Sequence, residues 1–167
     1  RVYRRQPRRI NNHGTTIHIR MNASDCEFCQ QKFSHTVMKD YRHWELQLFT
    51  KQSYLGRSLI KLKRHAIDLT DLEQKERKEL FEKVLPDLKD ALDEIFSPDL
   101  YNHATLGNDC RHFHFHVIPR YSSDRKFAGE KFVDENWNSH YKDSSDNNIS
   151  KEVFNEIMHT IQQEIQK

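Results

Sequence analysis

The chain of 167 residues is long enough for one domain with a single hydrophobic core. Hydrophobic residues make up 35% and charged residues 31%, and the apolar residues recur in periodic segments, which excludes a wholly disordered chain. The formal net charge of +2 excludes a chain that is strongly basic throughout. No apolar run approaches the roughly 18 residues of a membrane span, so we expect no membrane partner.

Positive charge is concentrated at the start of the chain, where the first 24 residues hold six arginines and no acidic residue. Residues 1–25 are therefore interpreted as a basic arm. The favoured interpretation is a solvated, partly disordered terminus. The alternative is a contact for the phosphates of a nucleic acid, which we regard as the less favoured partner.

The predicted elements begin with three short strands, at residues 35–38, 44–49 and 57–63. In the second of these, Trp44, Leu46 and Leu48 alternate with polar residues, as expected for a half-buried strand. A turn at residues 54–56 precedes the third strand.

A long amphipathic helix follows. Thr70-Asp71-Leu72-Glu73 has the form of a capping box at its start. Apolar residues then recur every four positions, at Leu80, Val84, Leu88 and Leu92. Pro86 predicts a kink or a division of this helix, and Ser97-Pro98-Asp99 predicts its end.

Two further strands, at residues 101–106 and 112–118, are predicted with a turn between them. The chain is then predicted to be irregular to about residue 149, with a polar linker at 143–149. A final amphipathic helix is predicted over residues 150–167, with Ser150 as its cap. The mixture of strands and helices without regular βαβ alternation predicts an α+β fold.

Three histidines alternate along the last predicted strand, at His112, His114 and His116. Alternate residues of a strand share one face, about 6.5–7 Å apart, so Phe113 and Phe115 are expected on the opposite face. A neutral imidazole can attack phosphorus while its neighbours hold the phosphate oxygens. His-x-His spacing suits zinc or copper equally well, so the spacing leaves catalysis and metal binding open.

The three cysteines, Cys26, Cys29 and Cys110, include a Cys-x-x-Cys pair. An odd number with such a pair favours a reducing compartment, and we expect a cytoplasmic protein. The pair is half of a tetrahedral zinc site, for which His65 and His112 are candidate partners. Free or redox-active thiols are the alternative.

These motifs, taken in order, resemble those of the histidine triad (HIT) family. The resemblance rests on Cys26 to Cys29, on Lys63-Arg64-His65 and on the run from His112 to Arg120, and it is supported by Leu106-Gly107-Asn108 and by Phe132 to Trp137. It covers about residues 26–142, which we take as a HIT-like domain. The most similar subgroup is that of bacterial diadenosine-polyphosphate hydrolases. The implied fold is an antiparallel sheet with one long helix and a C-terminal helix packed against it, usually as a homodimer.

The resemblance also implies a role for each motif. His114 corresponds to the nucleophile that takes a nucleotidyl group, and His116 to the histidine that hydrogen-bonds the phosphate. Gly107 and Asn108 correspond to the phosphate loop. Many family branches have histidine where this chain has Arg57, which we expect to hold a phosphate with two hydrogen bonds. The zinc quartet of a family subset corresponds to Cys26, Cys29, His65 and His112.

The sequence therefore predicts a hydrolase of nucleotide phosphoesters or phosphoanhydrides, with a dinucleoside polyphosphate or a nucleoside phosphoramidate as its substrate. Its intermediate would be a nucleotidyl group on His114, with structural Zn²⁺ and no cofactor for the chemical step. The alternatives are a nucleotidyl transferase of the same superfamily, a non-catalytic module that binds zinc and nucleotides, and a protein that processes nucleic-acid ends.

Overall fold

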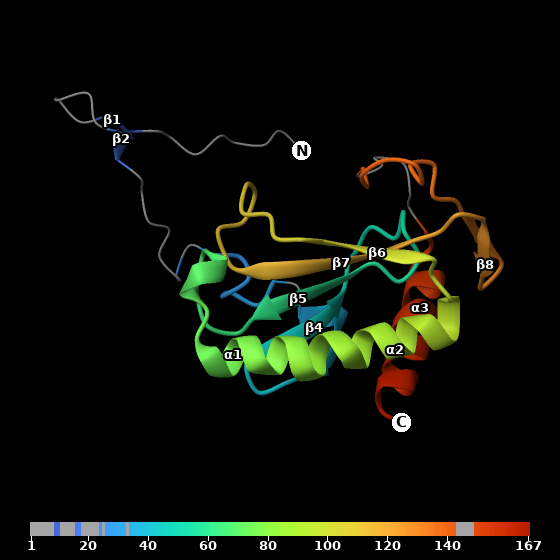
Figure 1. Ribbon diagram of the computed structural model, residues 1–167, viewed down its shortest axis with the longest axis horizontal. Coiled ribbons are helices and arrows are strands. Elements are labelled where there is room, and N and C mark those ends of the chain that lie inside the picture. The colour runs from blue at the N-terminus through green and yellow to red at the C-terminus, as the bar shows by residue number, and fades with distance from the viewer. Residues whose placement is uncertain (1–8, 11–15, 18–23, 25, 33, 143–148) are drawn as a thin grey trace.

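An antiparallel sheet of five strands, in the order β3-β4-β5-β7-β6, lies at the centre of the structure (Figure 1). The computed structural model describes residues 9–10, 16–17, 24, 26–32, 34–142 and 149–167. The strands of this sheet are β3 (Val37–Asp40), β4 (Trp44–Leu48), β5 (Ser58–Leu62), β6 (Leu100–Ala104) and β7 (His114–Arg120). A separate two-stranded pair is formed by β1 (Arg9–Ile10) and β2 (Thr16–Ile17). The predicted α+β class is confirmed.

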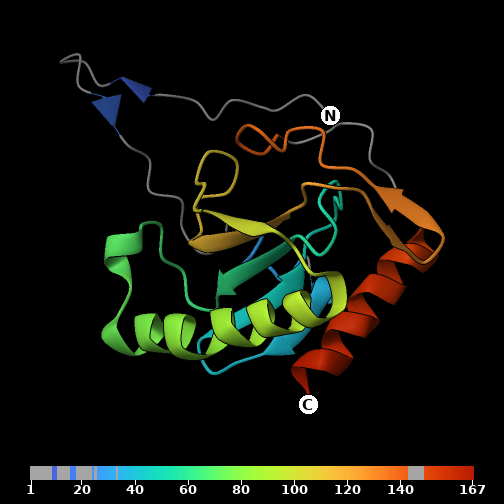
Figure 2. The same ribbon diagram turned by 45° about the vertical axis from the view of Figure 1, so that its right-hand side comes forward.

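One long helical segment runs across one side of the sheet (Figures 1 and 2). It comprises α1 (Gln74–Glu79), a π-helical turn (Leu80–Val84) and α2 (Leu85–Phe96). Pro86 lies in the first turn of α2. Because proline lacks an N–H and its ring clashes with the carbonyl four residues earlier, the helix widens immediately before it. The predicted division of the helix at this proline is thus present as a π-helical turn.

The C-terminal helix α3 (Lys151–Ile165) packs against α2 and β3. The Ser150 hydroxyl accepts a hydrogen bond from the Val153 N–H at 3.2 Å, so the predicted cap is confirmed. Val153, Ile157 and Ile161 are buried in the same hydrophobic core as α2 and the sheet. Among the described residues, no helix has both the length and the apolar character needed to cross a membrane.

The two faces of the sheet carry different side chains. On the helix side, alternate residues of the central strands are buried in the main core, among them Trp44, Leu46, Ile60, Phe113 and Val117. On the other side, the segment of residues 26–32 covers the sheet, and Phe28 packs with Cys26 and Leu59 in a second, smaller cluster. All five residues of β5 are buried because this strand lies between the two layers.

The start of the helical segment differs from the prediction. Thr70 belongs to a 3-10 turn (Leu69–Asp71) that is capped by Asp68. The helix α1 follows later, and its cap residue is Glu73, whose N–H donates to the Glu76 carboxylate at 2.7 Å. The predicted Thr70–Glu73 capping box is therefore wrong. Thr70 lies inside the 3-10 turn, where its N–H and hydroxyl donate to the Asp68 carboxylate, and the N-cap position of α1 falls on Glu73.

Strand boundaries also shift. The first predicted strand begins as a 3-10 turn (Ser34–Thr36) and becomes β3 only at Val37. The last begins at His114 and not at residue 112, because the Phe113 N–H donates to the carbonyl of Ala66, in the loop after β5, at 2.6 Å.

A hairpin that the sequence analysis missed follows β7. Its strands are β8 (Arg125–Phe127) and β9 (Glu130–Phe132). The two turn residues, Ala128 and Gly129, have φ values of 48° and 80°, as a two-residue hairpin turn requires. Alanine is unusual at such a position, so the turn lacked its common sequence signal. The predicted linker, apart from residue 149, and most of the basic arm lie outside the described residues.

Gly56 closes the turn before β5 under two constraints. Its φ of +80° is the left-handed conformation that favours glycine, and an added Cβ would lie 2.7 Å from Cδ2 of Leu92 and 3.1 Å from Phe96 on α2. Both neighbours are buried, so neither can move freely.

We expect Gly56→Ala to lower the free energy of unfolding by about 2–5 kcal/mol, from left-handed backbone strain and overpacking together. Gly129→Ala is the matched control, because Gly129 has the same φ but open space around a Cβ, and it should cost about 1–2 kcal/mol. Urea unfolding followed by circular dichroism measures both changes. If both variants lost the same free energy of unfolding, the close approach of residue 56 to α2 would carry no cost, and the prediction would be wrong.

Candidate functional site

His114 and His116 lie on β7 with their rings on the sheet face away from the long helix. Their ring centroids are 4.9 Å apart, and both residues are buried. Phe113 packs on the opposite face against Trp44. His112 precedes the strand but remains on the histidine side, since the Phe28 ring contacts both His112 and His114, at 5.5 and 5.2 Å between ring centroids.

A backbone hydrogen bond fixes the orientation and the tautomer of His114. Its Nδ1 lies 2.6 Å from the carbonyl oxygen of His112. Because a carbonyl can only accept, Nδ1 carries the proton and Nε2 presents its lone pair. Burial lowers the pKa of His114 below its usual value, although the His112 carbonyl and Asp109 act in the opposite direction. The lowered pKa favours the uncharged ring, whose Nε2 lone pair is not engaged by the His112 carbonyl.

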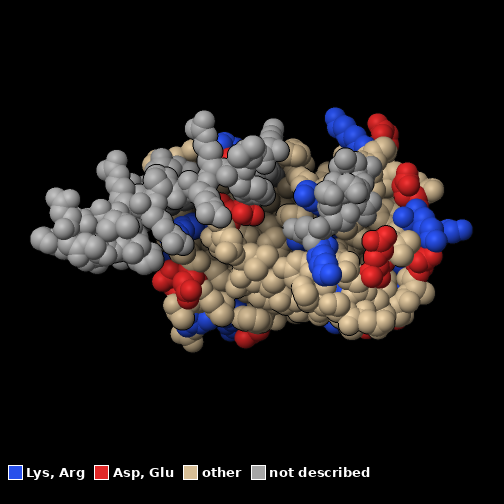
Figure 3. Space-filling view, turned by 90° about the horizontal axis from the view of Figure 1, so that it is seen from above, with Lys and Arg blue, Asp and Glu red and all other residues tan. Residues whose placement is uncertain are grey.

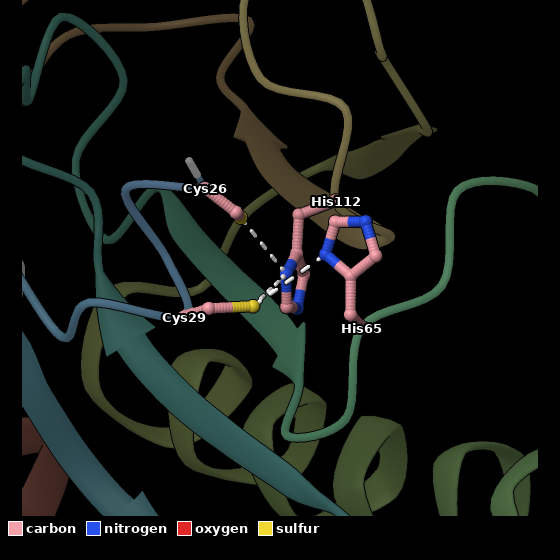
Figure 4. Close-up of side chains that lie close together, drawn as sticks. All are labelled: Cys26, Cys29, His65 and His112. Atoms are coloured by element: carbon pink, nitrogen blue, oxygen red, sulfur yellow. Dashed lines mark hydrogen bonds between the residues drawn. The ribbon is translucent and has the colours of Figure 1, made fainter. Parts of the chain in front are cut away.

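The four predicted metal ligands meet beside the start of β7 (Figure 4). Nδ1 of His112 is 3.3 Å from the Cys26 sulfur and 3.4 Å from the Cys29 sulfur, and Nδ1 of His65 is 3.5 Å from the Cys29 sulfur. The ligand atoms of Cys26, Cys29, His65 and His112 all lie within 4.8 Å of one another. This group could hold a metal ion.

The orientation and the protonation of the His112 ring suit a metal ligand. Its Nε2 lies 2.6 Å from the Leu62 carbonyl and must donate to it, so Nδ1 turns its lone pair toward the sulfurs. Burial lowers the pKa of His112 to about 4, which keeps the ring neutral. Burial and the neighbouring Cys26 raise the pKa of Cys29 to about 11, so a metal must displace a proton from this thiol.

Three separate parts of the chain supply the group. Cys26 and Cys29 lie on one turn, closed by a hydrogen bond from the Gln30 N–H to the Cys26 carbonyl at 3.0 Å. His65 lies in the loop after β5, and His112 in the loop before β7. Because β5 and β7 are paired with Lys61 opposite His114, the end of one strand lies beside the start of the other.

A pocket of about 320 Å³ adjoins His114 on the side of the loop between β6 and β7. Its walls include Thr105, Leu106, Gly107 and Arg111 from that loop, with Ile67, Asp68 and Leu69 from the loop after β5. Of the two residues predicted for the phosphate loop, Gly107 lines this pocket. Asn108 is exposed and does not line this pocket.

Arg57 has surroundings that the sequence does not indicate. Its guanidinium stacks on the Phe49 ring at 4.1 Å and lies 5.4 Å from the Tyr141 ring, and the residue is 1% exposed. The Phe49 ring in turn lies 5.6 Å from the His116 ring. Arg57 and His116 therefore both contact the Phe49 ring.

Arg120, at the end of β7, holds the segment that carries Tyr141. It forms a buried ion pair with Asp134 at 2.6 Å and also donates to the Ser139 carbonyl at 3.0 Å. The segment that follows β9 is thereby held near the end of the site where Arg57 lies.

Two aromatic residues of the site, Phe28 and Phe49, were missed by the sequence analysis. Both line a small apolar cleft of about 80 Å³, together with Thr36, Gln47, Leu48, Thr50 and Leu59. Phe28 contacts His114 and Phe49 contacts His116, so the cleft borders the histidine pair. The position of Phe28 inside the Cys-x-x-Cys motif was a usable signal, but that of Phe49 was not.

Residues 51–123 match the family model of the HIT domain. This segment of the chain is therefore similar to the HIT domain. HIT proteins are in general nucleotide hydrolases or transferases, so the similarity supports a nucleotide-directed activity in general terms. None of the curated proteins matches the sequence.

Solved HIT structures share the fold. A hypothetical histidine triad nucleotide-binding protein from Sulfolobus tokodaii has a TM-score of 0.62 and 17% identity, over 84% of this chain and 92% of that chain. A Zn-bound histidine triad family protein from Mycobacterium smegmatis has a TM-score of 0.57 and 19% identity, over 85% and 96% of the two chains. A HIT family protein from Bacillus anthracis has a TM-score of 0.56 and 24% identity, over 85% and 98%.

We expect the purified protein to contain about one metal ion per chain, because four protein ligands complete a tetrahedral site. Cys29→Ser should lose most of the metal, as measured by elemental analysis. Cys110→Ser is the matched control, since Cys110 packs against the same cluster but is not one of the four ligands. Less than about half an ion per chain in the unmodified protein would contradict a metal site.

Proposed function

We propose that this protein hydrolyses nucleotide phosphoesters or phosphoanhydrides through a nucleotidyl intermediate on His114. The hydrogen bond from His114 Nδ1 to the His112 carbonyl carries the proposal, because it leaves Nε2 as a free lone pair. The lowered pKa keeps that nitrogen unprotonated at neutral pH. The neighbouring pocket gives room for a substrate.

The reaction has two displacements. In the first, Nε2 of His114 forms a bond to the α-phosphorus while the bond from phosphorus to the leaving group breaks, and the electron pair departs with the leaving group. In the second, water forms a bond to phosphorus, the phosphorus–nitrogen bond breaks, and His114 regains its lone pair. The water releases one proton to solvent, and the product is a nucleoside monophosphate.

The remaining site residues bind and orient the substrate in this proposal. His116, with its ring 4.9 Å from that of His114, binds a phosphate oxygen. Gly107, which lines the pocket, contributes a backbone N–H group from the loop before the triad, whereas Asn108, outside the pocket wall, is given no role. Arg57, buried behind Phe49, supports that ring rather than reaching the phosphate directly. The apolar cleft beside Phe49 receives part of the nucleoside.

We propose that the metal is Zn²⁺ in a structural role. With Zn–S near 2.3 Å and Zn–N near 2.0 Å, a tetrahedral site places sulfur and nitrogen about 3.5 Å apart. The sulfur-to-nitrogen distances of 3.3, 3.4 and 3.5 Å fit that value. Four protein ligands leave no open position on the ion, so His112 holds the metal and transfers no proton. Thiols kept reduced for this role agree with the expected cytoplasmic location.

His114→Asn tests the intermediate. The unmodified protein, incubated with diadenosine tetraphosphate and quenched, should carry an adenylyl group on His114 in peptide mass spectrometry. The variant should lose the label and about 1,000-fold or more of the turnover, because the nucleophile is gone.

His140→Asn is the control, because His140 is exposed and lies outside the pocket beside His114. Full turnover by His114→Asn would contradict the mechanism. Products that incorporate an added phosphate or sugar phosphate would identify a transferase instead of a hydrolase.

We also propose a homodimer that forms at β6, an edge strand of the sheet. An apolar hollow of about 490 Å³ lies between this strand and the long helix, lined by Phe81, Leu85, Tyr101 and Phe115 among others. Phe81 is 54% exposed, which is unusual for a large apolar side chain unless another surface covers it. The face seen in Figure 3 is charged, unlike this apolar hollow. On it, Lys and Arg side chains are interspersed with Asp and Glu, and no extended basic patch is visible among the coloured residues.

Phe81→Asp should convert the dimer into a monomer, since a buried carboxylate would face the partner chain. Analytical ultracentrifugation should give twice the 20.2 kDa mass of one chain for the unmodified protein and the single mass for the variant. Lys151→Asp, exposed on α3, is the control and should remain dimeric. A monomeric unmodified protein at micromolar concentration would contradict the proposal.

A further inference from the structure

Arg111 is an exposed cation on the wall of the pocket beside His114. Within the described residues it forms no hydrogen bond and no ion pair. The other charged residue of the pocket wall is Asp68, whose carboxylate already accepts from the Thr70 N–H and hydroxyl at 2.9 and 2.7 Å. An arginine that has no partner among the described residues, next to the proposed nucleophile, is available to bind an anion from solution.

We propose that Arg111 binds the anionic leaving group of the substrate and thereby selects phosphate leaving groups over neutral amines. This inference rests on the proposed nucleotidyl transfer to His114. It assigns to the chain a specificity-determining residue that directly precedes the triad.

The arrangement of the two hollows around His114 supports this assignment. The apolar cleft for the nucleoside is built on the β4 and β5 side of the histidine pair, through Gln47, Leu48 and Leu59. The pocket with Arg111 lies on the side of the β6–β7 loop, which rises above the sheet beside the start of β7 in Figures 1 and 2. A phosphorus atom held at His114 therefore has its nucleoside on one side and space for its leaving group on the other.

Charge explains why the leaving group needs a cation here. When the bond from the α-phosphorus to the bridging oxygen breaks, the electron pair stays on that oxygen and the departing phosphate chain gains one negative charge. Asp68 lines the same pocket, and Asp109 lies close enough to His114 to influence its pKa. Both carboxylates would repel the departing anion. The Arg111 guanidinium offsets this repulsion and stabilises the new charge.

A neutral leaving group gives a clear comparison. The amine released from a nucleoside phosphoramidate takes up a proton and carries no negative charge away, so Arg111 contributes little to its departure. The two substrates share the nucleoside, the α-phosphate and His114, and they differ in what enters the pocket with Arg111.

The test compares the full-length protein with Arg111→Gln on diadenosine tetraphosphate and on adenosine 5′-phosphoramidate. The kcat/KM ratio of the first substrate to the second should fall about tenfold or more, as expected for the loss of one charge-assisted contact. Arg111→Lys should restore part of the ratio because it keeps the charge. Lys126→Gln, which removes an exposed cation on β8, should leave the ratio as it is in the unmodified protein.

An unchanged ratio in Arg111→Gln, with adenylylation of His114 intact, overturns the role of Arg111 and leaves the proposed function standing. If the unmodified protein never forms the adenylyl intermediate, the proposed function fails. Titration calorimetry with inorganic tripolyphosphate then decides on Arg111 alone. Binding that weakens about tenfold in Arg111→Gln supports the anion site, and equal or absent binding in both proteins overturns it.

Discussion

His112 connects the four residues that could hold a metal with His114, through its side chain on one hand and its backbone carbonyl on the other. One ring nitrogen faces the sulfurs of Cys26 and Cys29, and the other donates to the Leu62 carbonyl at 2.6 Å. The carbonyl of the same residue accepts from Nδ1 of His114 at 2.6 Å. Any metal held by this ring would therefore also fix the backbone that orients the His114 ring, although the metal takes no part in the phosphoryl transfer that we propose.

The two faces of the central sheet bury different kinds of side chain. Its helix side is an ordinary apolar core, which the long helix and α3 complete. Its other side also buries polar groups, among them Lys61, His114 and His116. Lys61 and Glu45 form an ion pair at 2.6 Å, and the Lys61 ammonium also donates to the Phe28 carbonyl at 3.4 Å. Such pairs add little net stability, but they hold the Cys-x-x-Cys turn against the sheet where the histidines emerge.

Much of the fold and of the site could be predicted because the relevant signals are local. Alternation placed His114 and His116 on one face of a strand, and the serine at position 150 marked the start of α3. Predictions failed where the local signal was ambiguous or absent. Thr70 lies inside the 3-10 turn that Asp68 caps, so the expected capping box did not form at the start of α1. The β8–β9 hairpin was missed because Ala128 occupies a turn position where glycine or asparagine is usual.

By itself, the sequence determined the α+β class, the family motifs and the identity of the four residues that could hold a metal. Spacing alone left metal binding and catalysis undecided among three equivalent histidines. Tertiary structure gives them different surroundings, because it brings His112 to Cys26, Cys29 and His65 and leaves His114 and His116 outside that group. Only the fold could also place Arg57 against the Phe49 ring and Arg111 in the same pocket wall as His114. These contacts join residues that are distant in the chain or separated by a loop, and local sequence patterns carry no information about them.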